Sequence, residues 1–542
     1  MGAPMAAPPT TFGIDLGTTH SCVAYVDESG RPVIARNAVS EDTTPSVVYF
    51  EGPGRVLVGS SAKNSALLAP HLVAQLVKRD MGRQGVEFGY HGRAYTPEEI
   101  SALILRELAR SAEESTGRQV RDVVITVPAY FGVAEKEATR RAGEIAGLNV
   151  LDVLAEPVAA ALHHQGLEST DRARHLLVYD LGGGTFDTTA IRVERDDIRV
   201  VCTDGDQALG GADWDRRIVE HLLEVFRARH PRLDPAADEE AMQEFHSTAE
   251  ELKKALSRTE SRRAQLRFAG AAAGVELTRA DLRRLTGDLL DRTMEITRRT
   301  LEVARRKGIE RFDDVLLAGG MTRMPAVAEN LRTRFGLDAR LSEPDLAVAK
   351  GAALFALLRQ VGDTGGAARE VAGQLGISAA DVEAAAAKRV TTVVPRAFGV
   401  KAIDPTDPEA HNNPLRARQI VTHLLAANTE LPADTGPFPF ATGVDNQRMA
   451  EIEVWEQKGQ EESEDLADNT RVGRGVLKGI PPRPAGTRIE ITFRMSGTGT
   501  LAVHAQEQES GQEVRFELAI GGMDHRAVDA ARTDIARHEV SG

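Results

Sequence analysis

Two short glycine-containing stretches, each with an aspartate just before the glycines, constrain this chain more than any other feature. One is "YDLGGGTFD" at residues 179–187, and the other is "GIDLGTTHS" at residues 13–21. Glycine lacks a Cβ and costs a strand or helix conformational entropy, so three in succession indicate a backbone that must approach something closely. Backbone N–H groups cleared in this way are the donors that phosphate oxygens require. Two such turns predict two related halves that hold one nucleotide between them.

The aspartates beside these glycines point to a metal ion. Asp15, Asp180 and Asp187 cannot hold a phosphate directly, because like charges repel each other. They can hold Mg²⁺ or its water molecules, and the ion then neutralises the phosphates. A glycine-rich hairpin turn is the alternative for either stretch alone, and the recurrence of the pattern weakens it. Neither a Walker-type P-loop nor a dinucleotide-binding G-x-G-x-x-G pattern occurs in the sequence.

Composition limits the classes of protein that the chain can be. Its 542 residues exceed what one ordinary core supports, so two or three domains are expected. A formal net charge of -14 argues against nucleic acid as a general partner. Cys22 and Cys202 are far apart in sequence and suit a reducing cytoplasm without a disulfide framework. No apolar run reaches the length of a membrane span, so no membrane partner is expected.

Three zones along the chain differ in pattern. Strand-like runs such as "VVITVPAY" alternate with helical patterns over residues 11–360, which predicts an α/β domain. Residues 361–395 are rich in Gly and Ala and predict a linker that carries one short helix. Short runs such as "TRIEITFRM" over residues 396–521 predict a compact antiparallel β-domain. Residues 1–10 are expected to be a disordered tail, and residues 522–542 a short helix and tail.

A series of motifs in one order resembles the DnaK-type seventy-kilodalton heat-shock chaperone family. The motifs are "IDLGTTHSCVA", "ITVPAYF", "LAEPVAAAL", "YDLGGGTFD", "LGGADWD", "EELKKALS" and "LLAGGMTRMPAV". They cover the first zone nearly end to end, and the β-domain is similar to the family's more loosely. The resemblance implies an α/β fold: an actin-like, ribonuclease-H-like ATPase domain of two lobes, followed by an antiparallel β-sandwich that binds peptides.

The resemblance also implies a site for ATP or ADP with Mg²⁺. The residues that would act in hydrolysis are Lys78, Glu156, Thr185 and Asp187, and those that would position the ion through its water shell are Asp15 and Asp180. The residues that would contact the nucleotide are Gly17, Thr18, Thr19, Gly182, Gly183, Gly184, Gly210, Gly211, Glu250, Lys253, Ser257, Gly319, Gly320, Arg323 and Asp345. Without the resemblance, Lys78 is an exposed lysine in a basic run. The alternative for the helix face at residues 250–257 is a solvated surface.

The segments that resemble the family's interdomain relay depart from its pattern. The resemblance makes Pro128 and Lys136 switch residues, with the lysine where an arginine is usual. Gly132 and Val133 stand where the family has Asn-Asp, so coupling between domains is in doubt. An Ala-rich insertion and "RVTTVVPRAFGVK" replace the family's apolar linker. The "VTTVV" stretch can still add a strand to a sheet edge, which is how such a linker would dock.

In the β-domain the resemblance points to a peptide site. Ala450 and Ile452 are expected to face the peptide pocket, with Phe440 supporting it and Gly443 near an arch over the peptide. The family prefers a branched residue where the alanine stands, so a shallower or differently shaped pocket is expected. Family members continue into a helical lid, whereas one short helix is expected after Ile520 here. The expectation is therefore a divergent member that lacks the lid.

Two functions remain at this point. The first is an ATP-dependent chaperone that hydrolyses ATP to regulate its binding of unfolded or extended polypeptides. The resemblance then implies a bacterial, cytoplasmic stress-response protein, served by a J-domain co-chaperone and a nucleotide-exchange factor. The second is a nucleotide-dependent scaffold or regulator whose β-domain binds one dedicated partner. A nucleotide-dependent affinity for generic apolar peptides would favour the first.

Overall fold

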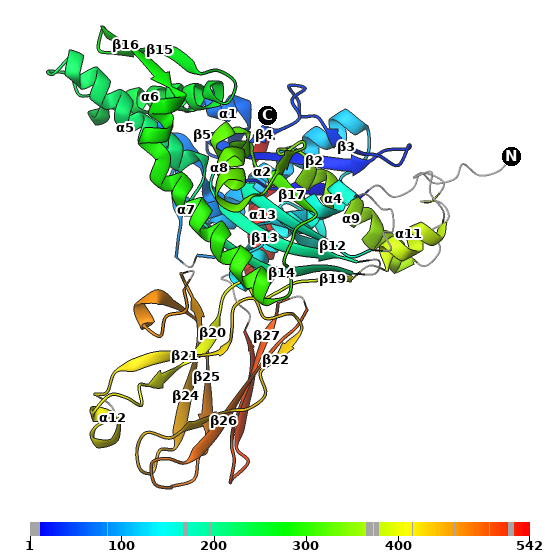
Figure 1. Cartoon of the computed structure of the whole chain (residues 1–542), viewed down its shortest axis with the longest axis vertical. Helices are drawn as coiled ribbons and strands as arrows, with labels where there is room; N and C mark the ends of the chain where they lie inside the picture. Colours follow the sequence, from blue (N-terminus) through cyan, green and yellow to red (C-terminus); the bar gives the residue numbers. More distant parts are fainter. Residues whose placement is uncertain are drawn as a thin grey trace.

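The computed structural model describes residues 11–542 with ten internal gaps, and the predicted tail at residues 1–10 lies outside the described residues. The gaps are residues 84, 166–171, 195–196, 365–371, 373–378, 388, 415, 460, 498 and 519–524. We call residues 11–364 the α/β region and residues 396–518 the β-domain. The β-domain lies below the α/β region in the view of Figure 1. Among the described helices, none is both long and apolar enough to cross a membrane.

A six-stranded mixed sheet forms the first half of the α/β region. Its order is β11-β10-β1-β2-β3, with β4 paired to β2. The strands are β1 (Phe12–Asp15), β2 (His20–Val26), β3 (Pro32–Ala35), β4 (Thr44–Pro45), β10 (Asp122–Val127) and β11 (Asn149–Ala155). Strands β1 to β3 are antiparallel, and β10 and β11 continue the sheet in parallel with β1.

A second six-stranded sheet repeats this plan. Its order is β18-β17-β12-β13-β14-β19, with β12 to β14 antiparallel and β17 and β18 parallel to β12. The strands are β12 (Arg174–Leu181), β13 (Phe186–Val193), β14 (Asp197–Asp206), β17 (Asp314–Ala318), β18 (Ala339–Leu341) and β19 (Arg389–Thr391). The two glycine-containing turns join the first two strands of each sheet, so they occupy the same topological position. The expectation of two related halves agrees with this repeat.

Two helices pack against each other between the sheets. They are α4 (Glu156–Gln165) and α9 (Ala347–Thr364), and their apolar side chains share one core with residues of both sheets. Small residues make this approach possible: a Cβ on Gly351 of α9 would lie 1.8 Å from the carbonyl oxygen of Ala159 in α4. A Cβ on Gly13 of β1 would lie 2.2 Å from the backbone nitrogen of Ala353. Strand β1, which leads into the first glycine-containing turn, therefore packs directly against α9.

Helices surround this central stack and extend one side of it. They are α1 (Ser60–Ser65), α2 (Pro97–Thr116), α3 (Val133–Ile145), α5 (Gly211–Arg229), α6 (Glu239–Leu256), α7 (Arg279–Arg306) and α8 (Pro325–Phe335). The hairpin of β15 (Ser261–Phe268) and β16 (Ala271–Thr278) packs with α5 to α7 at the upper left of Figure 1. Local sequence sets the helix ends: Thr96 and Glu99 form a capping box at the start of α2, and Gly117 ends that helix at φ 67.

The β-domain consists of two antiparallel sheets that share one apolar core. The first has the order β21-β20-β24-β25, formed by β20 (Phe398–Ile403), β21 (Gln419–Leu425), β24 (Met449–Gln457) and β25 (Asn469–Lys478). The second has the order β22-β26-β27-β28 with β23 also paired to β26, formed by β22 (Ala433–Asp434), β23 (Phe438–Ala441), β26 (Arg488–Met495), β27 (Leu501–Glu507) and β28 (Glu513–Leu518). A short helix, α12 (Glu409–Asn412), lies in the loop between β20 and β21. Alternating buried positions, as in β27, place one face of each strand in the core.

The connection to the β-domain docks on the second sheet. Within the described part of residues 361–395, α9 ends, α11 (Ala379–Ala386) follows, and β19 pairs in parallel with β14. The register joins Ile198 to Val390, and Thr391 Oγ1 donates a hydrogen bond to Asp197 Oδ1 at 3.0 Å. The expected addition of a strand by the "VTTVV" stretch is therefore confirmed.

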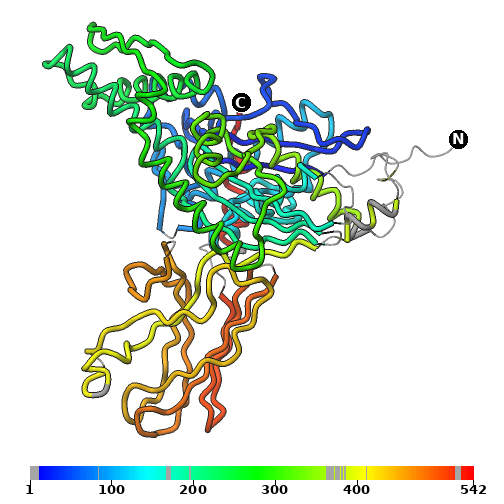
Figure 2. The backbone as a smooth tube through the Cα atoms, viewed as in Figure 1, coloured from blue at the N-terminus to red at the C-terminus, as the bar shows by residue number. Residues whose placement is uncertain are grey.

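The end of the chain returns to the α/β region, which the sequence analysis did not foresee. Helix α13 (His525–Ile535) packs on α2 and α3, and strand β29 (Glu539–Ser541) pairs in parallel with β6 (Arg55–Val58). Beyond β6 the same sheet continues through β5 (Val47–Gly52) to β7 (Val73–Gln75). Figure 2 shows the C-terminus in the upper part of the molecule, away from the strands of the β-domain. Helix α13 agrees with the short helix predicted within residues 522–542. The tail expected after it is instead strand β29, because its backbone bonds to a sheet edge.

Candidate functional site

A cavity of about 820 Å³ lies between the two halves of the α/β region. Both glycine-containing turns border it, together with α6 and the turn after β17. Of the predicted nucleotide, metal and hydrolysis residues, those that line it are Asp15, Gly17, Thr18, Thr19, Lys78, Glu156, Asp180, Gly182, Gly183, Thr185, Gly211, Glu250, Lys253, Ser257, Gly319, Gly320, Arg323 and Asp345. The structure thus brings residues from distant parts of the chain to one concave surface.

The two glycine-containing turns press against each other at the base of this cavity. A Cβ on Gly183 would lie 2.1 Å from Thr19 Oγ1, and one on Gly184 would lie 2.2 Å from Thr18 Cγ2. A Cβ on Gly210 would lie 2.5 Å from the backbone of Gly184, which explains the glycine before α5. Gly184 and Gly210 therefore support the turns from behind, while Gly182 and Gly183 border the cavity. Side chains at Gly183 or Gly184 would push the two turns apart. Glycine turns of this kind can present backbone N–H groups to a phosphate.

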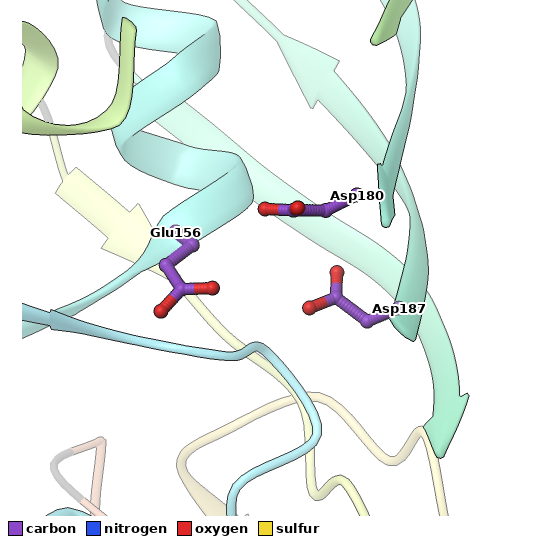
Figure 3. Close-up of side chains that lie close together, drawn as sticks. All are labelled: Glu156, Asp180 and Asp187. Carbon is purple, nitrogen blue, oxygen red and sulfur yellow. The ribbon is translucent and has the colours of Figure 1, made fainter. Parts of the chain in front are cut away.

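Three buried carboxylates converge beside the second turn. Oxygen atoms of Glu156, Asp180 and Asp187 lie within 4.8 Å of one another, and Figure 3 shows the three side chains facing a common centre. Burial and the neighbouring carboxylates raise the pKa of Asp180 and of Asp187 well above the ordinary range. Burial, followed by the charge of Glu156, raises the pKa of Asp15 to about 7. Such a concentration of oxygen ligands fits a hard divalent cation such as Mg²⁺, whose charge would favour the ionised carboxylates.

One lysine partly balances this negative charge. Lys78 Nζ lies 2.7 Å from Glu156 Oε1, and both side chains are buried. The neighbouring Arg79 donates through Nε to the carbonyl oxygen of Gly184 at 2.8 Å and pairs with Asp213 at 2.6 Å. The short helix at residues 77–80 is therefore tied to the second glycine turn. This places the ammonium of Lys78 over the carboxylate cluster rather than in a solvated basic run.

The opposite end of the cavity is formed by α6 and by the turn after β17. Glu250 pairs with Lys63 of α1 at 2.5 Å, and Lys253 pairs with Asp215 of α5 at 2.6 Å. The predicted face of α6 is thus held by ion pairs. Across the cavity, Arg323 pairs with Asp345 at 2.5 Å.

Gly319 begins the turn that carries Arg323, and its φ of 80 lies in the left-handed region. A Cβ there would come within 2.6 Å of Asp180 Oδ1. The glycine therefore lets this turn approach the carboxylate cluster closely.

Several lining residues escaped sequence reasoning. Asp215 and Lys254 line the cavity, and Lys254 lies 2.7 Å from Glu250. A signal for Lys254 existed, because it follows Glu250 by four residues and so shares its helix face. His20 and Thr43 also border the cavity. His20 lies within the first glycine-containing stretch, whereas the position of Thr43 carries no comparable signal.

One of the two predicted switch residues, Lys136, lies beside the junction with the β-domain, where the charge of Glu456 acts on it. Pro128 follows β10, and its carbonyl oxygen accepts a hydrogen bond from the N–H of Phe131 at 3.1 Å. Burial lowers the pKa of Lys136. Arg396 forms an ion pair across this junction with Glu135 at 2.9 Å, and it was missed by sequence reasoning. Its partner is distant in sequence, and so no local pattern marks it.

The predicted peptide residues lie in or near the core of the β-domain. Ala450 and Ile452 are 9% and 5% exposed and belong to the apolar core, and Phe440 packs against it. A Cβ on Gly443 would lie 3.3 Å from Ile403 Cδ1. In this arrangement the two pocket residues point inward and not toward an open groove. Among the described residues of the β-domain, the exposed large apolar side chains are Phe438, Val444, Met449 and Val476.

Comparison with protein families matches the chain to the family described as Hsp70 protein. The matched residues are 11–87, 70–396 and 416–538. The match includes both glycine-containing turns, the carboxylate cluster and most of the β-domain.

Proposed function

Because the chain belongs to the Hsp70 family, whose members are ATPases and chaperones, we propose that it binds and hydrolyses ATP to regulate its binding of unfolded or extended polypeptides. The two six-stranded sheets would be the lobes of an actin-like ATPase. The observation that carries the proposal is the meeting of two glycine turns and a carboxylate cluster at one cavity. In this proposal the protein works in a reducing cytoplasm. A J-domain co-chaperone and a nucleotide-exchange factor would be its partners.

The position of each residue in the cavity suggests its role in binding or hydrolysing ATP. The backbone N–H groups of the two turns, with the hydroxyls of Thr18 and Thr19, would hold the phosphates. Asp15 and Asp180 would hold Mg²⁺ through its water shell, and that ion, when bound, neutralises phosphate charge. Glu156 and Asp187 would order the attacking water, and Lys78 would fix its direction. Positioning and charge neutralisation are most of what phosphoryl transfer requires.

The test of this assignment is a single-turnover measurement with Lys78→Ala. The variant is expected to retain bound ATP and to lose hydrolysis, because the turns and α6 remain while the ammonium is gone. Lys350→Ala is the matched control, since Lys350 of α9 pairs with Glu343 at 2.7 Å and does not line the cavity. Hydrolysis by Lys78→Ala near the parent rate would remove Lys78 from this role.

The second candidate is a scaffold whose β-domain binds one dedicated partner while the ATPase acts as a timer. The inward position of Ala450 and Ile452 favours it, because a generic peptide site needs an open apolar pocket. The two candidates differ in whether affinity for unrelated apolar peptides depends on the nucleotide.

A further inference from the structure

The first turn of α3 enters the β-domain. Val133 and Ala134 pack against the apolar core of the β-domain, and a Cβ on Gly499 would lie 3.7 Å from Val133 Cγ2. The departure from the family's Asn-Asp at residues 132 and 133 is thereby explained in part at position 133. An apolar side chain at position 133 is buried against an apolar surface, where a carboxylate would be costly.

A buried ion triad lies beside this contact. Arg396, at the start of the β-domain, lies 2.9 Å from Glu135 of α3 and 3.7 Å from Glu456 of β24. Gln207 Nε2 donates to the same oxygen of Glu135 at 2.8 Å. All three charged side chains are at most 16% exposed. One arginine therefore joins a carboxylate of the α/β region to a carboxylate of the β-domain.

The glycine at position 132 is what makes room for the triad. A Cβ there would lie 2.4 Å from Glu456 Oε1 and 2.9 Å from Glu135 Oε2. These two oxygens are buried and have no hydrogen-bond partner among the described residues. Gly132, Glu456 and Arg396 thus fit one another, and a side chain at position 132 would separate the carboxylates from the arginine.

The other end of the same segment reaches the carboxylate cluster. The backbone N–H of Ala129 donates a hydrogen bond to Asp187. The ring of Phe131 has its centroid 5.8 Å from Lys78 Nζ. Only a few residues therefore separate the groups beside Asp187 from the glycine that faces Glu456. A shift at either end must be accommodated within residues 128–135.

We propose that Arg396 is a positioning residue that couples the nucleotide site to docking of the β-domain, through Glu135 and the segment at residues 128–135. This rests on the proposed ATPase function. Arg396 and Glu456 belong to the same domain and stay together if that domain moves away. Glu135 then loses its ion pair with Arg396, which the docked arrangement provides. Docking therefore depends on the position of α3, and α3 depends on the groups beside Asp187.

A tryptophan of the β-domain can report on its docking by fluorescence. Trp455 precedes Glu456 in β24 and donates through Nε1 to Glu453 at 3.1 Å, whereas Trp214 is fully buried in the α/β region. Tryptophan emission and nucleotide affinity are measured with ATP and with ADP in the full chain carrying Arg396→Met, Glu135→Gln or both. Trp455→Phe identifies the source of the signal. Arg418→Met is the matched control, because Arg418 pairs with Asp404 inside the β-domain.

The parent and the control are expected to show an emission difference between ATP and ADP. Arg396→Met and Glu135→Gln are each expected to lose this emission difference. Because coupling between sites is reciprocal, each variant should also change the ratio of the ADP to the ATP dissociation constant by about fivefold or more. The double variant is expected to add nothing further. Arg396→Lys is expected to restore part of the difference.

A purely structural role would lower the affinity for both nucleotides together and leave their ratio unchanged, and that result would overturn the proposal. A parent-like emission difference in Arg396→Met, or no difference in a parent that hydrolyses ATP, would overturn it while leaving the proposed ATPase intact. A parent that binds neither nucleotide would instead overturn the proposed function itself.

Discussion

Replacing Ile535 by alanine tests the docking of the C-terminal segment at residues 525–542. Ile535 is 0% exposed and lies with Val528 and Ala531 in the core formed by α2, α3 and the first sheet. Truncation of a buried isoleucine costs about 2–5 kcal/mol. Arg106 also binds the carbonyl oxygens of Ile535 and His538, and Tyr95 Oη lies 3.0 Å from His538 Nε2. Because those contacts survive, we expect a cost of about 2–3 kcal/mol.

This cost should appear as local opening, since the segment can leave the surface without unfolding the sheets. A loss of 2–3 kcal/mol raises the open population roughly 30- to 150-fold. Hydrogen exchange of the Glu539 amide, which donates to Gly54 at 2.8 Å, measures it directly. Arg537→Ala is the control, because Arg537 is exposed on the same segment. Exchange in Ile535→Ala within twofold of the parent would show that the segment is not anchored as described.

Two further substitutions probe the cradle and the buried triad. Gly183→Ala should abolish nucleotide binding in titration calorimetry, because its Cβ would lie 2.1 Å from Thr19 Oγ1; Gly287→Ala, where a Cβ meets open space, should bind normally. Burial raises the pKa of Glu456 from 4.5 to about 7 against the opposing charge of Arg396. The folded protein then holds a proton that the unfolded chain releases, so stability should fall by roughly 2–3 kcal/mol as pH rises from about 4.5 to 7 and then level off. Urea unfolding of Glu456→Gln should lack this fall, and an unchanged pH profile would contradict the assignment.

The parts of the site that could be predicted from sequence are the parts that local chemistry specifies. Asp15 and Asp180 lie within two residues of a strand end and precede glycine turns, so the repeated pattern predicts a shared role for them. The helix spacing placed Glu250, Lys253 and Ser257 on one face, and all three border the cavity. In each case the physical constraint acts within a few residues of the chain.

The parts that escaped prediction depend on partners brought in by the fold. Arg396 acts through Glu135, which lies 261 residues earlier. Lys63 pairs with Glu250, which lies 187 residues later in the chain. Strand β29 is three residues long and carries no alternating pattern; it is a strand because β6 offers an unpaired edge. Ala450 and Ile452 were expected at a pocket, but the alternation of β24 turns them into the core.

The most direct test of the account is the affinity of a fluorescently labelled, extended apolar peptide, measured by anisotropy with Mg²⁺ and either ATP or ADP. We predict that the dissociation constant differs between the two nucleotides by about fivefold or more, as expected for energetically coupled sites. The difference should vanish in Gly183→Ala, which cannot form the phosphate cradle. Equal affinity with both nucleotides in the parent, or no binding with either, would contradict an ATP-regulated chaperone and support a scaffold for one dedicated partner.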